Sequence, residues 1–279
     1  MKKKMYKNMK NKFIKMHGLG NDFAIFDERQ GDNRLGTGQI RQLSDRRLGI
    51  GCDQLIVMEP SQKAAVFMRI YNSDGSQSEA CGNATRCVGR LIMDETHADS
   101  TTIETLAGVL TVTRQGPADI TVDMGRIKTR WQDIPLAEDV DTLRLPISLA
   151  GLSEPTAINI GNPHAVFFVE DVAAVDIARI GPQIENHPLF PSRTNVEFAQ
   201  VISSAHLRMR VWERGVGITK ACGSGACAVA AAAICRGLAD RRVTVTLDGG
   251  DLEIYWREDD EHILMTGPAV ESFRGEVEI

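Results

Sequence analysis

The sequence predicts an α+β fold of two pseudo-symmetric halves, each a curved, mostly antiparallel sheet or barrel wrapped around a central helix. Three observations predict it: an internal repeat, runs of β-branched and aromatic residues typical of strands, and a helical segment that is apolar on every side. The length of 279 residues by itself permits one large domain or two of ordinary size. The repeat favours two similar halves.

A single offset of 141 residues aligns several separated blocks of the chain without a gap. It carries EACGN at 79–83 onto KACGS at 220–224, and GNDFAIF at 20–26 onto GNPHAVF at 161–167. The same offset matches MRIYN with MRVWE and TLAG with TLDG. Agreement of separated blocks at one offset indicates a duplicated unit.

Each half has the pattern strand, loop, strand, helix, two strands, polar loop, helix and hairpin. In the first half, QLIVM and AVFMRIY predict strands, and helices are expected at about 38–47 and 82–95. A segment near 128–146, rich in proline and aspartate, predicts the connection between the halves.

In the second half, VEFAQVI and LRMRVW predict strands, and the clearest helix runs from about 223 to 237. Its small apolar residues occur on all sides, so we expect this helix to be buried all round.

Composition excludes several classes of protein. Lys and Arg number 32 against 37 Asp and Glu, a net charge of −5, which argues against a nucleic-acid partner. Six of the first twelve residues are lysine with no apolar stretch after them, which predicts a solvated tail and not a secretory signal. The longest apolar run, Cys227 to Cys235, is too short to span a bilayer. We therefore expect a cytoplasmic protein.

The six cysteines predict reduced thiols, and their spacing predicts no metal site. Two of them, Cys81 and Cys222, occupy the same repeated position, each before a glycine at a predicted helix start. Backbone N–H groups there lack partners inside the helix, so the position attracts anions and is expected to lower the pKa of a thiol. The other four are expected to be small buried hydrophobic residues.

Two thiols that flank one cleft would suit a two-base racemase. If the halves face each other, one thiolate removes a proton from a tetrahedral carbon and the opposing thiol delivers one to the other face. The two helix starts could hold the adjacent carboxylate and offset its developing charge. This arrangement needs no cofactor.

Other polar residues also recur at the 141-residue offset, which predicts that they line the cleft. The matched pairs are Asn21 with Asn162, Gln54 with Asn195, and Asn72 with Glu213. Two further residues, His164 and Arg214, have no polar counterpart, as recognition of an unsymmetrical substrate requires. The guanidinium of Arg214 could bind a carboxylate through two hydrogen bonds.

These motifs resemble the diaminopimelate epimerase family over nearly the whole chain. The resemblance rests on MHGLGNDF, GIGCDQ, YNSDGSQSEACGN, GNPHAV, RTNVEF and WERGVGITKACGSGACA. It implies a cofactor-independent isomerase that interconverts LL- and meso-diaminopimelate, in lysine and peptidoglycan precursor biosynthesis. Cys81 and Cys222 would be its acid and base, with Cys81 the base toward the LL substrate.

The resemblance also implies the remaining site residues. Backbone N–H groups at Gly82, Asn83, Gly223 and Ser224 would hold the α-carboxylate, and Arg214 the distal one. The substrate would also contact Asn21, Gln54, Asn72, Asn162, Asn195 and Glu213, with His164 and Glu213 in orienting roles.

For the architecture, the resemblance implies a homodimer and a last strand that returns to the first domain. We expect one half at 1–127, completed by 268–279, and the other at 128–267. One departure is visible, because Ala84 stands where many relatives have glycine, which places the local carboxylate site in question.

Two other functions fit parts of the pattern. A proline or hydroxyproline racemase would use the same two thiols but would give Arg214 and the ring of amides no purpose. A thiol redox switch or a non-catalytic ligand-binding module would also pair the cysteines, although no C-x-x-C motif is present.

Overall fold

The computed structural model describes residues 10–31 and 35–278. Most of the lysine-rich segment that was expected to form a solvated tail therefore lies outside the described residues. Its last part is not a tail, because the first strand begins at Lys10 and pairs with the last strand of the chain.

The first half contains eight strands and two helices among the described residues. They are β1 (Lys10–Gly18), β2 (Asn21–Asp27), α1 (Thr37–Ser44), β3 (Gln54–Glu59), β4 (Val66–Asn72), β5 (Gln77–Ser78), α2 (Gly82–Thr96), β6 (Ser100–Thr105), β7 (Gly108–Arg114) and β8 (Asp119–Arg126).

The rest of the chain repeats this order after a short hairpin. The elements are β9 (Ser148–Leu149), β10 (Leu152–Ser153), β11 (Thr156–Asn159), β12 (Pro163–Phe168), a 3₁₀ turn (Val172–Ala174), α3 (Ile177–Glu185), β13 (Asn195–Ser203), β14 (His206–Glu213), β15 (Gly217–Thr219), α4 (Gly223–Cys235), β16 (Arg242–Leu247), β17 (Gly250–Trp256), β18 (His262–Pro268) and β19 (Val270–Glu278).

The 141-residue offset relates the helices and strands of the two halves as well as their sequences. It carries the first residue of β3, Gln54, onto Asn195 at the start of β13, and Gly82 at the start of α2 onto Gly223 at the start of α4. It also places α1 on α3, whose ends the sequence did not define. The predicted fold class, two similar halves of mostly antiparallel sheet with a central helix, is confirmed.

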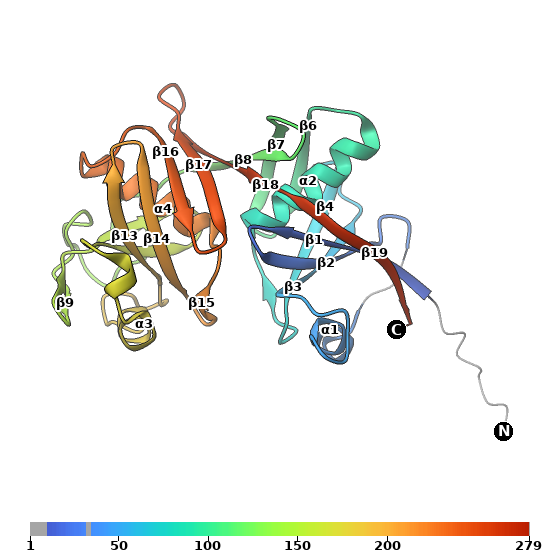
Figure 1. The fold of residues 1–279 in the computed structure, drawn as a ribbon, viewed down its shortest axis with the longest axis horizontal. Coiled ribbons are helices and arrows are strands. Elements are labelled where there is room, and N and C mark those ends of the chain that lie inside the picture. Colours follow the sequence, from blue (N-terminus) through green and yellow to red (C-terminus); the bar gives the residue numbers. More distant parts are fainter. Residues whose placement is uncertain (1–9, 32–34, 279) are drawn as a thin grey trace.

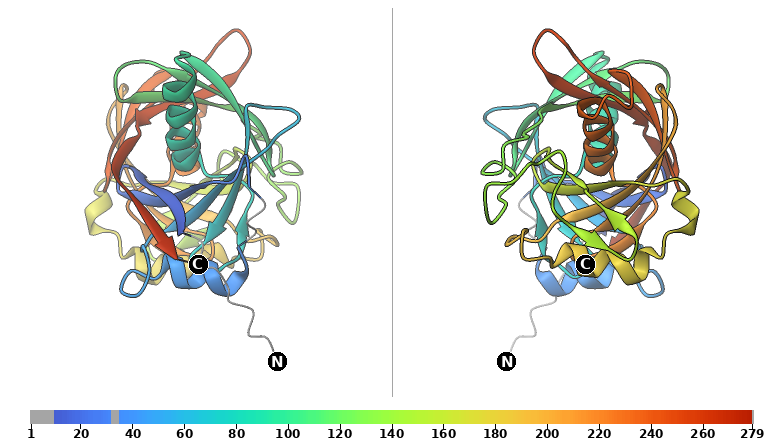
Figure 2. Two further views of the ribbon diagram at one scale, coloured as in Figure 1. Left: turned by 90° about the vertical axis from the view of Figure 1, so that its right-hand side faces the viewer. Right: turned by 90° about the vertical axis from the view of Figure 1, so that its left-hand side faces the viewer.

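All the described strands except β9 and β10, which pair with each other, form one continuous sheet. In the first half the order is β19, β1, β2, β3, β4, β6, β7, β8, and in the second it is β18, β17, β16, β14, β13, β12, β11. The halves are joined because β8 pairs with β18, after which the chain crosses back and β19 pairs with β1. Figure 1 shows the halves side by side with β8 and β18 running between them, and Figure 2 shows each ring of strands end-on around its helix. Where one domain ends and the other begins remains a prediction.

Both central helices are deeply packed. α2 lies against β1, β6, β7 and β8, and α4 lies against strands on every side from β11 to β18. Every residue of α4 from Ala226 to Ala233 is fully buried, which confirms the prediction from its all-apolar pattern. Its small side chains let the surrounding sheet approach the backbone closely, so the helix start is held rigidly.

Two predicted helix ends differ by a few residues. α1 stops at Ser44 because the side chain of Asp45 accepts hydrogen bonds from the N–H groups of Arg47 and Leu48, which favours a turn. α4 stops at Cys235, and the chain turns at Gly237, whose φ is +68°.

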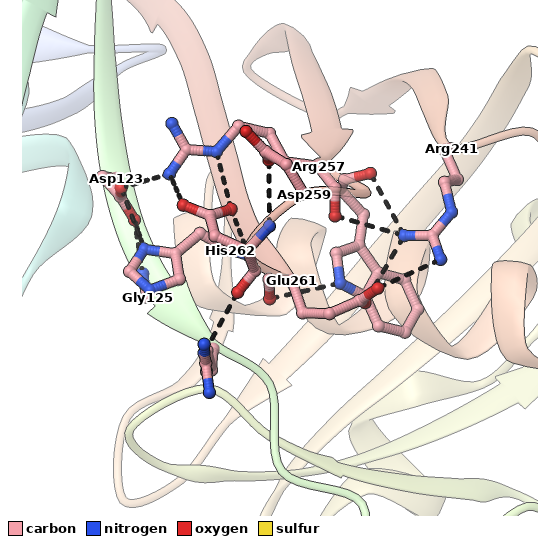
Figure 3. A network of polar contacts seen from close by, with 10 residues as sticks. Asp123, Gly125, Arg241, Arg257, Asp259, Glu261 and His262 are labelled. Atoms are coloured by element: carbon pink, nitrogen blue, oxygen red, sulfur yellow. Dashed lines mark hydrogen bonds and ion pairs between the residues drawn. The ribbon is translucent and has the colours of Figure 1, made fainter.

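A polar network fixes the crossing of β8 and the β17–β18 hairpin (Figure 3). Asp123 on β8 accepts hydrogen bonds from His262 Nδ1 at 2.9 Å and from Arg257 Nη2 at 3.0 Å. Arg126 Nε donates to the Asp260 carbonyl at 3.0 Å. These contacts join the two halves outside the core.

Candidate active site

The starts of the two central helices converge. Cys81 and Cys222 are the residues that immediately precede α2 and α4, and both have extended backbone angles. A Cβ on Gly82 would lie 2.7 Å from Met265 Cε, and a Cβ on Gly223 would lie 2.8 Å from Met265 Sδ. Both glycines therefore face one methionine of β18, and each of them directly follows one of the two cysteines.

Asn83 ties the two helix starts together. Its Nδ2 donates to Asn21 Oδ1 at 3.1 Å and across the halves to the Ala221 carbonyl at 3.3 Å. Its Oδ1 accepts from Arg86 Nη2 at 3.0 Å. Arg86 is fully buried, and burial lowers the pKa of its guanidinium. This chain of hydrogen bonds fixes the position of each cysteine relative to the other.

The two thiols have similar surroundings. Burial raises the pKa of Cys81 to about 11, opposed by the N–H group of Ala84, while the charge of Glu213 raises it further. Burial also raises the pKa of Cys222, and so do the charges of Glu213 and Glu197. Because Glu213 acts on both sulfurs, the two thiols and this carboxylate share one site.

The helix starts were expected to lower the pKa of these thiols, and this expectation is wrong, because the net shift of both pKa values is upward. Backbone N–H groups do favour the thiolate of Cys81, but burial outweighs them. At neutral pH both thiols therefore carry their protons in this structure. The local sequence indicates the helix start, but it does not show that strands distant in the chain bury the sulfur away from water.

This protonation predicts slow alkylation of Cys81 in the absence of substrate. Only the thiolate reacts with iodoacetamide, so with a pKa of about 11 the rate should still rise between about pH 9 and pH 10. Peptide mapping by mass spectrometry would follow Cys81, with glutathione alkylated in parallel as the reference thiol. A rate that levels off below about pH 8 would contradict the assigned direction of the shift.

Predicted first-half residues form two hydrogen-bonded groups. Asn21 Nδ2 donates to Asp53 Oδ2 at 3.0 Å, and its Oδ1 lies 3.9 Å from Cys81 Sγ. Gln54 Nε2 donates to Asn72 Oδ1 at 3.0 Å, and the buried Gln54 Oε1 has no hydrogen-bond partner in the described part of the chain. An unpaired buried acceptor is suited to a ligand donor.

Asp53 is held in turn by a charged cluster. Arg46 Nη2 contacts Asp53 Oδ1 and Asp22 Oδ1, each at 2.6 Å, and Lys15 Nζ contacts Asp22 Oδ2 at 2.6 Å. Burial alone would raise the pKa of Asp22, but the hydrogen bonds from Arg46 and Lys15 outweigh it and lower the pKa to about 2. Asp22 therefore stays ionised at neutral pH, and the cluster fixes Asp53, which holds the carboxamide of Asn21.

In the second half, His164 is fully buried between two acceptors. Its Nδ1 lies 2.7 Å from Glu197 Oε1, and its Nε2 lies 2.8 Å from Asn162 Oδ1. Glu197 is also fully buried.

Glu213, Arg214 and Asn195 lie next to one another. Burial raises the pKa of Glu213, opposed by hydrogen bonds from Thr219 and Cys222. Asn195 Oδ1 accepts from the Arg214 N–H group at 2.9 Å, and Arg214 Nη1 donates to the Ser192 carbonyl at 3.1 Å.

Some of the predicted site residues lie next to the thiols or the helix starts, and others do not. Asn21, Asn83 and Ser224 lie within contact of a thiol or of the helix starts, the last with its Oγ 3.6 Å from Cys222 Sγ. The Gln54–Asn72 and Asn195–Arg214 pairs have no hydrogen bond to either thiol among the described residues. Across residues 10–31 and 35–278, no group of His, Cys, Asp or Glu is placed to hold a metal ion. In the same ranges, no helix combines the length and apolar character needed to cross a bilayer.

The sequence profile of the diaminopimelate epimerase family matches residues 13–129 and 156–271. Both cysteines and both helix starts lie inside these matched segments. The chain belongs to the diaminopimelate epimerase family. A relative from Rhodospirillum centenum named diaminopimelate epimerase is 50% identical over 271 residues, covering 96% of this chain and 93% of the relative. One of the same name from Erythrobacter litoralis is 51% identical over 270 residues, covering 96% and 97%.

Solved structures with lower identity share the fold. A hydroxyproline epimerase from Agrobacterium vitis superposes with a TM-score of 0.72 at 14% identity, covering 98% of this chain and 94% of that one. A phenazine biosynthesis protein of the PhzF family from Bacillus anthracis gives 0.66 at 15%, covering 97% and 100%. The two-half architecture is therefore common to diaminopimelate epimerases and to these more distant proteins.

The departure at Ala84 leaves the backbone of the helix start intact. Ala84 is helical and fully buried, and its N–H group still favours the Cys81 thiolate. Its φ is not positive, so no glycine is needed for the backbone at this position.

Sequence reasoning missed two groups that contact predicted site residues. Asp53, within the GIGCDQ motif, orients Asn21, and Glu197, within RTNVEF, contacts His164. A comparison of the halves could have found Glu197, because the 141-residue offset sets it against the apolar Ile56.

Proposed function

We propose that the chain is a cofactor-independent epimerase that interconverts LL- and meso-diaminopimelate, in lysine and peptidoglycan precursor biosynthesis. The observation that carries the proposal is the convergence on Met265 of the two helix starts, Gly82 and Gly223, each of which directly follows a cysteine. We infer the identity of the substrate from membership of the diaminopimelate epimerase family.

In the direction from LL to meso, the Cys81 thiolate removes the α-proton and becomes a thiol. The Cys222 thiol then gives its proton to the opposite face of the carbon and becomes a thiolate, so the configuration inverts. Negative charge passes from one sulfur through the substrate to the other, and no electron is gained or lost.

Forming the first thiolate requires compensation for the negative charge near both sulfurs. Glu213 opposes ionisation of Cys81 and Cys222. The α-ammonium group of an amino acid placed beside Glu213 would offset that charge and favour release of one thiol proton to solvent. Substrate binding would thereby generate the base.

The carboxylate next to the reacting carbon takes up charge as the proton leaves. Backbone N–H groups at the starts of α2 and α4, at Gly82–Asn83 and Gly223–Ser224, are suited to stabilise it. The distal end of the substrate would be bound by Arg214 with Asn162 and Asn195, and the near end by Asn21, Gln54, Asn72 and Asn83.

A substrate assay separates this function from the nearest alternative. The purified chain should epimerise LL-diaminopimelate and leave L-proline unchanged, because only a substrate with a distal carboxylate uses Arg214. Chiral chromatography of both amino acids after incubation would measure this. Turnover of proline alone would refute the assignment, and turnover of neither would favour a redox or binding role for the thiols.

We further propose a cytoplasmic homodimer. The six cysteines are free thiols, as expected in a reducing compartment. β19 pairs with β1 along one edge, and Phe273 on this strand is 51% exposed, so the strand offers an apolar contact to a second copy. Sedimentation of the purified protein would measure the oligomeric state.

A further inference from the structure

Arg86 is a buried charge that the proposed mechanism does not use. Its side chain on α2 is fully buried, and no Asp or Glu of the described residues forms an ion pair with it. Burial lowers the pKa of the guanidinium, and the groups that oppose this effect are Cys87, Cys81 and Cys227. An arginine still carries its charge at neutral pH. A buried charge without a counter-charge is unfavourable for folding, which argues for a functional role.

The surrounding chain is shaped to hold this guanidinium. Nε of Arg86 donates to the carbonyl of Pro268 at the end of β18, at 3.3 Å, and Nη2 donates to Asn83 Oδ1 at 3.0 Å. A Cβ at Gly18 would lie 2.8 Å from Nη2. The φ of Gly18 is not positive, so space for the guanidinium, and not backbone conformation, accounts for a glycine at this position.

The partners of Asn83 fix the orientation of its carboxamide. A guanidinium only donates and a backbone carbonyl only accepts, so Oδ1 of Asn83 faces Arg86 and Nδ2 faces the carbonyl of Ala221. Nδ2 also donates to Asn21 Oδ1 at 3.1 Å. Ala221 directly precedes Cys222. The charge of Arg86 is therefore tied, through one side chain, to the junction of the two helix starts.

The second half has no equivalent of this charge. The 141-residue offset sets Arg86 against Cys227, which is fully buried in α4. Burial is the largest effect on the pKa of both thiols at the helix starts and raises it, but the charge of Arg86 opposes this effect at Cys81. At Cys222 the next largest effects are the charges of two carboxylates, which raise the pKa further. Of the two sulfurs, Cys81 therefore has the surroundings that better accommodate a negative charge.

Resting on the proposed function, we propose that Arg86 is a positioning residue: held by Asn83 and by the Pro268 carbonyl, its guanidinium keeps a positive charge at the start of α2 and favours a thiolate on Cys81 over one on Cys222. Arg86 is fully buried and does not touch the substrate. When Cys81 loses its proton, the thiolate supplies the negative charge that the guanidinium lacks. The first thiolate then lies on Cys81, as epimerisation from LL to meso requires.

The first test removes the charge and keeps a side chain of similar reach. In Arg86→Met, iodoacetamide at about pH 9 should alkylate Cys81 about tenfold more slowly than in wild type, because only the thiolate reacts. Peptide mapping by mass spectrometry would follow Cys81 and Cys222 in the same sample, and the rate at Cys222 should change less. A merely structural role predicts the opposite sign, because a loosened site would expose both sulfurs and accelerate both reactions.

The same variant has a kinetic signature. In Arg86→Met, kcat for LL-diaminopimelate should fall about tenfold with a smaller change in KM, because the lost charge acts on the base and not on substrate binding. A fall in kcat/KM that came from KM alone would overturn the proposal.

Two matched variants separate the charge from the hydrogen bonds. Arg86→Lys keeps the charge with fewer donors, so the alkylation rate of Cys81 should stay within about threefold of wild type. Arg90 on the same helix donates to the carbonyl of Ala269, next to Pro268. Arg90→Met therefore also removes an arginine contact from this segment, and it should leave both the alkylation of Cys81 and kcat unchanged.

Alkylation of Cys81 in Arg86→Met at the wild-type rate or faster would overturn the proposal. Equal slowing in Arg86→Lys and Arg86→Met would overturn it too, because that result assigns the effect to the shape of the guanidinium. If Arg86→Met does not fold, wild type decides: Cys81 should be alkylated faster than Cys222, and the reverse order would overturn the inference. The alkylation rates do not depend on turnover, so an inactive wild type with the expected rates would refute only the proposed function.

Discussion

Replacing either Cys81 or Cys222 by alanine should lower kcat for epimerisation by about a thousandfold or more. In the proposed mechanism each variant loses the acid–base group on one side of the carbon, and positioned acid–base groups contribute about 10²- to 10⁴-fold each. Both variants should stay folded, because alanine fits where the small cysteine was and neither residue lies inside its helix. Coupled assay of LL-diaminopimelate turnover at matched enzyme concentration would measure the loss.

Matched controls for this prediction are Cys87→Ala and Cys227→Ala. Both cysteines are fully buried in α2 and α4, one or two turns beyond the helix starts, and burial raises the pKa of each to about 12. These variants should keep kcat within a few-fold of wild type. Unimpaired turnover in Cys81→Ala or in Cys222→Ala would refute the two-base mechanism.

Replacing Arg214 by methionine should reduce kcat/KM for LL-diaminopimelate about 10²-fold or more, mainly through KM. Methionine has a similar reach without the charge, and a bidentate bond between a guanidinium and a carboxylate is among the stronger polar contacts. Arg210→Met is the control, because Arg210 lies on β14, which ends one residue before Arg214, and pairs with Asp248 at 3.4 Å. It should leave KM unchanged.

An inhibitor pair tests which carboxylate Arg214 binds. L-Lysine is diaminopimelate without one carboxylate, so inhibition by lysine should be equal in wild type and Arg214→Met. Inhibition by meso-diaminopimelate should weaken in the variant. Equal weakening for both compounds would show that Arg214 binds the near end of the substrate, contrary to the proposed orientation.

Much of the architecture could be predicted because the two halves share local signals. The alanine-rich helix after Cys222 and its counterpart after Cys81 follow from glycine at the helix start and apolar residues on the buried faces. The strands followed from β-branched runs. The pairing of β19 with β1, which completes the ring of strands in the first half, could not be predicted from local sequence patterns. Val270–Glu278 is mostly exposed and lacks a clear buried face.

The electrostatics of the site could not be predicted from local sequence. The pKa of Cys81 depends on burial by strands that are distant in the chain, and this effect exceeds that of the helix start. Local sequence also did not show that Glu197 belongs to the site. It lies in a strand among apolar residues, and its contact with His164 and the effect of its charge on Cys222 place the carboxylate there.

The central claim is that two thiols from the two halves act on opposite faces of one carbon, and hydrogen exchange tests it most directly. LL-Diaminopimelate would be incubated in heavy water and the reaction stopped at a few per cent conversion. A thiol carries one proton, so return from Cys81 restores the original hydrogen, whereas inversion brings deuterium from Cys222. The meso product should therefore carry deuterium at the inverted carbon while the recovered LL substrate stays unlabelled. Product that retains the substrate's own hydrogen, or equal labelling of both pools, would contradict the account.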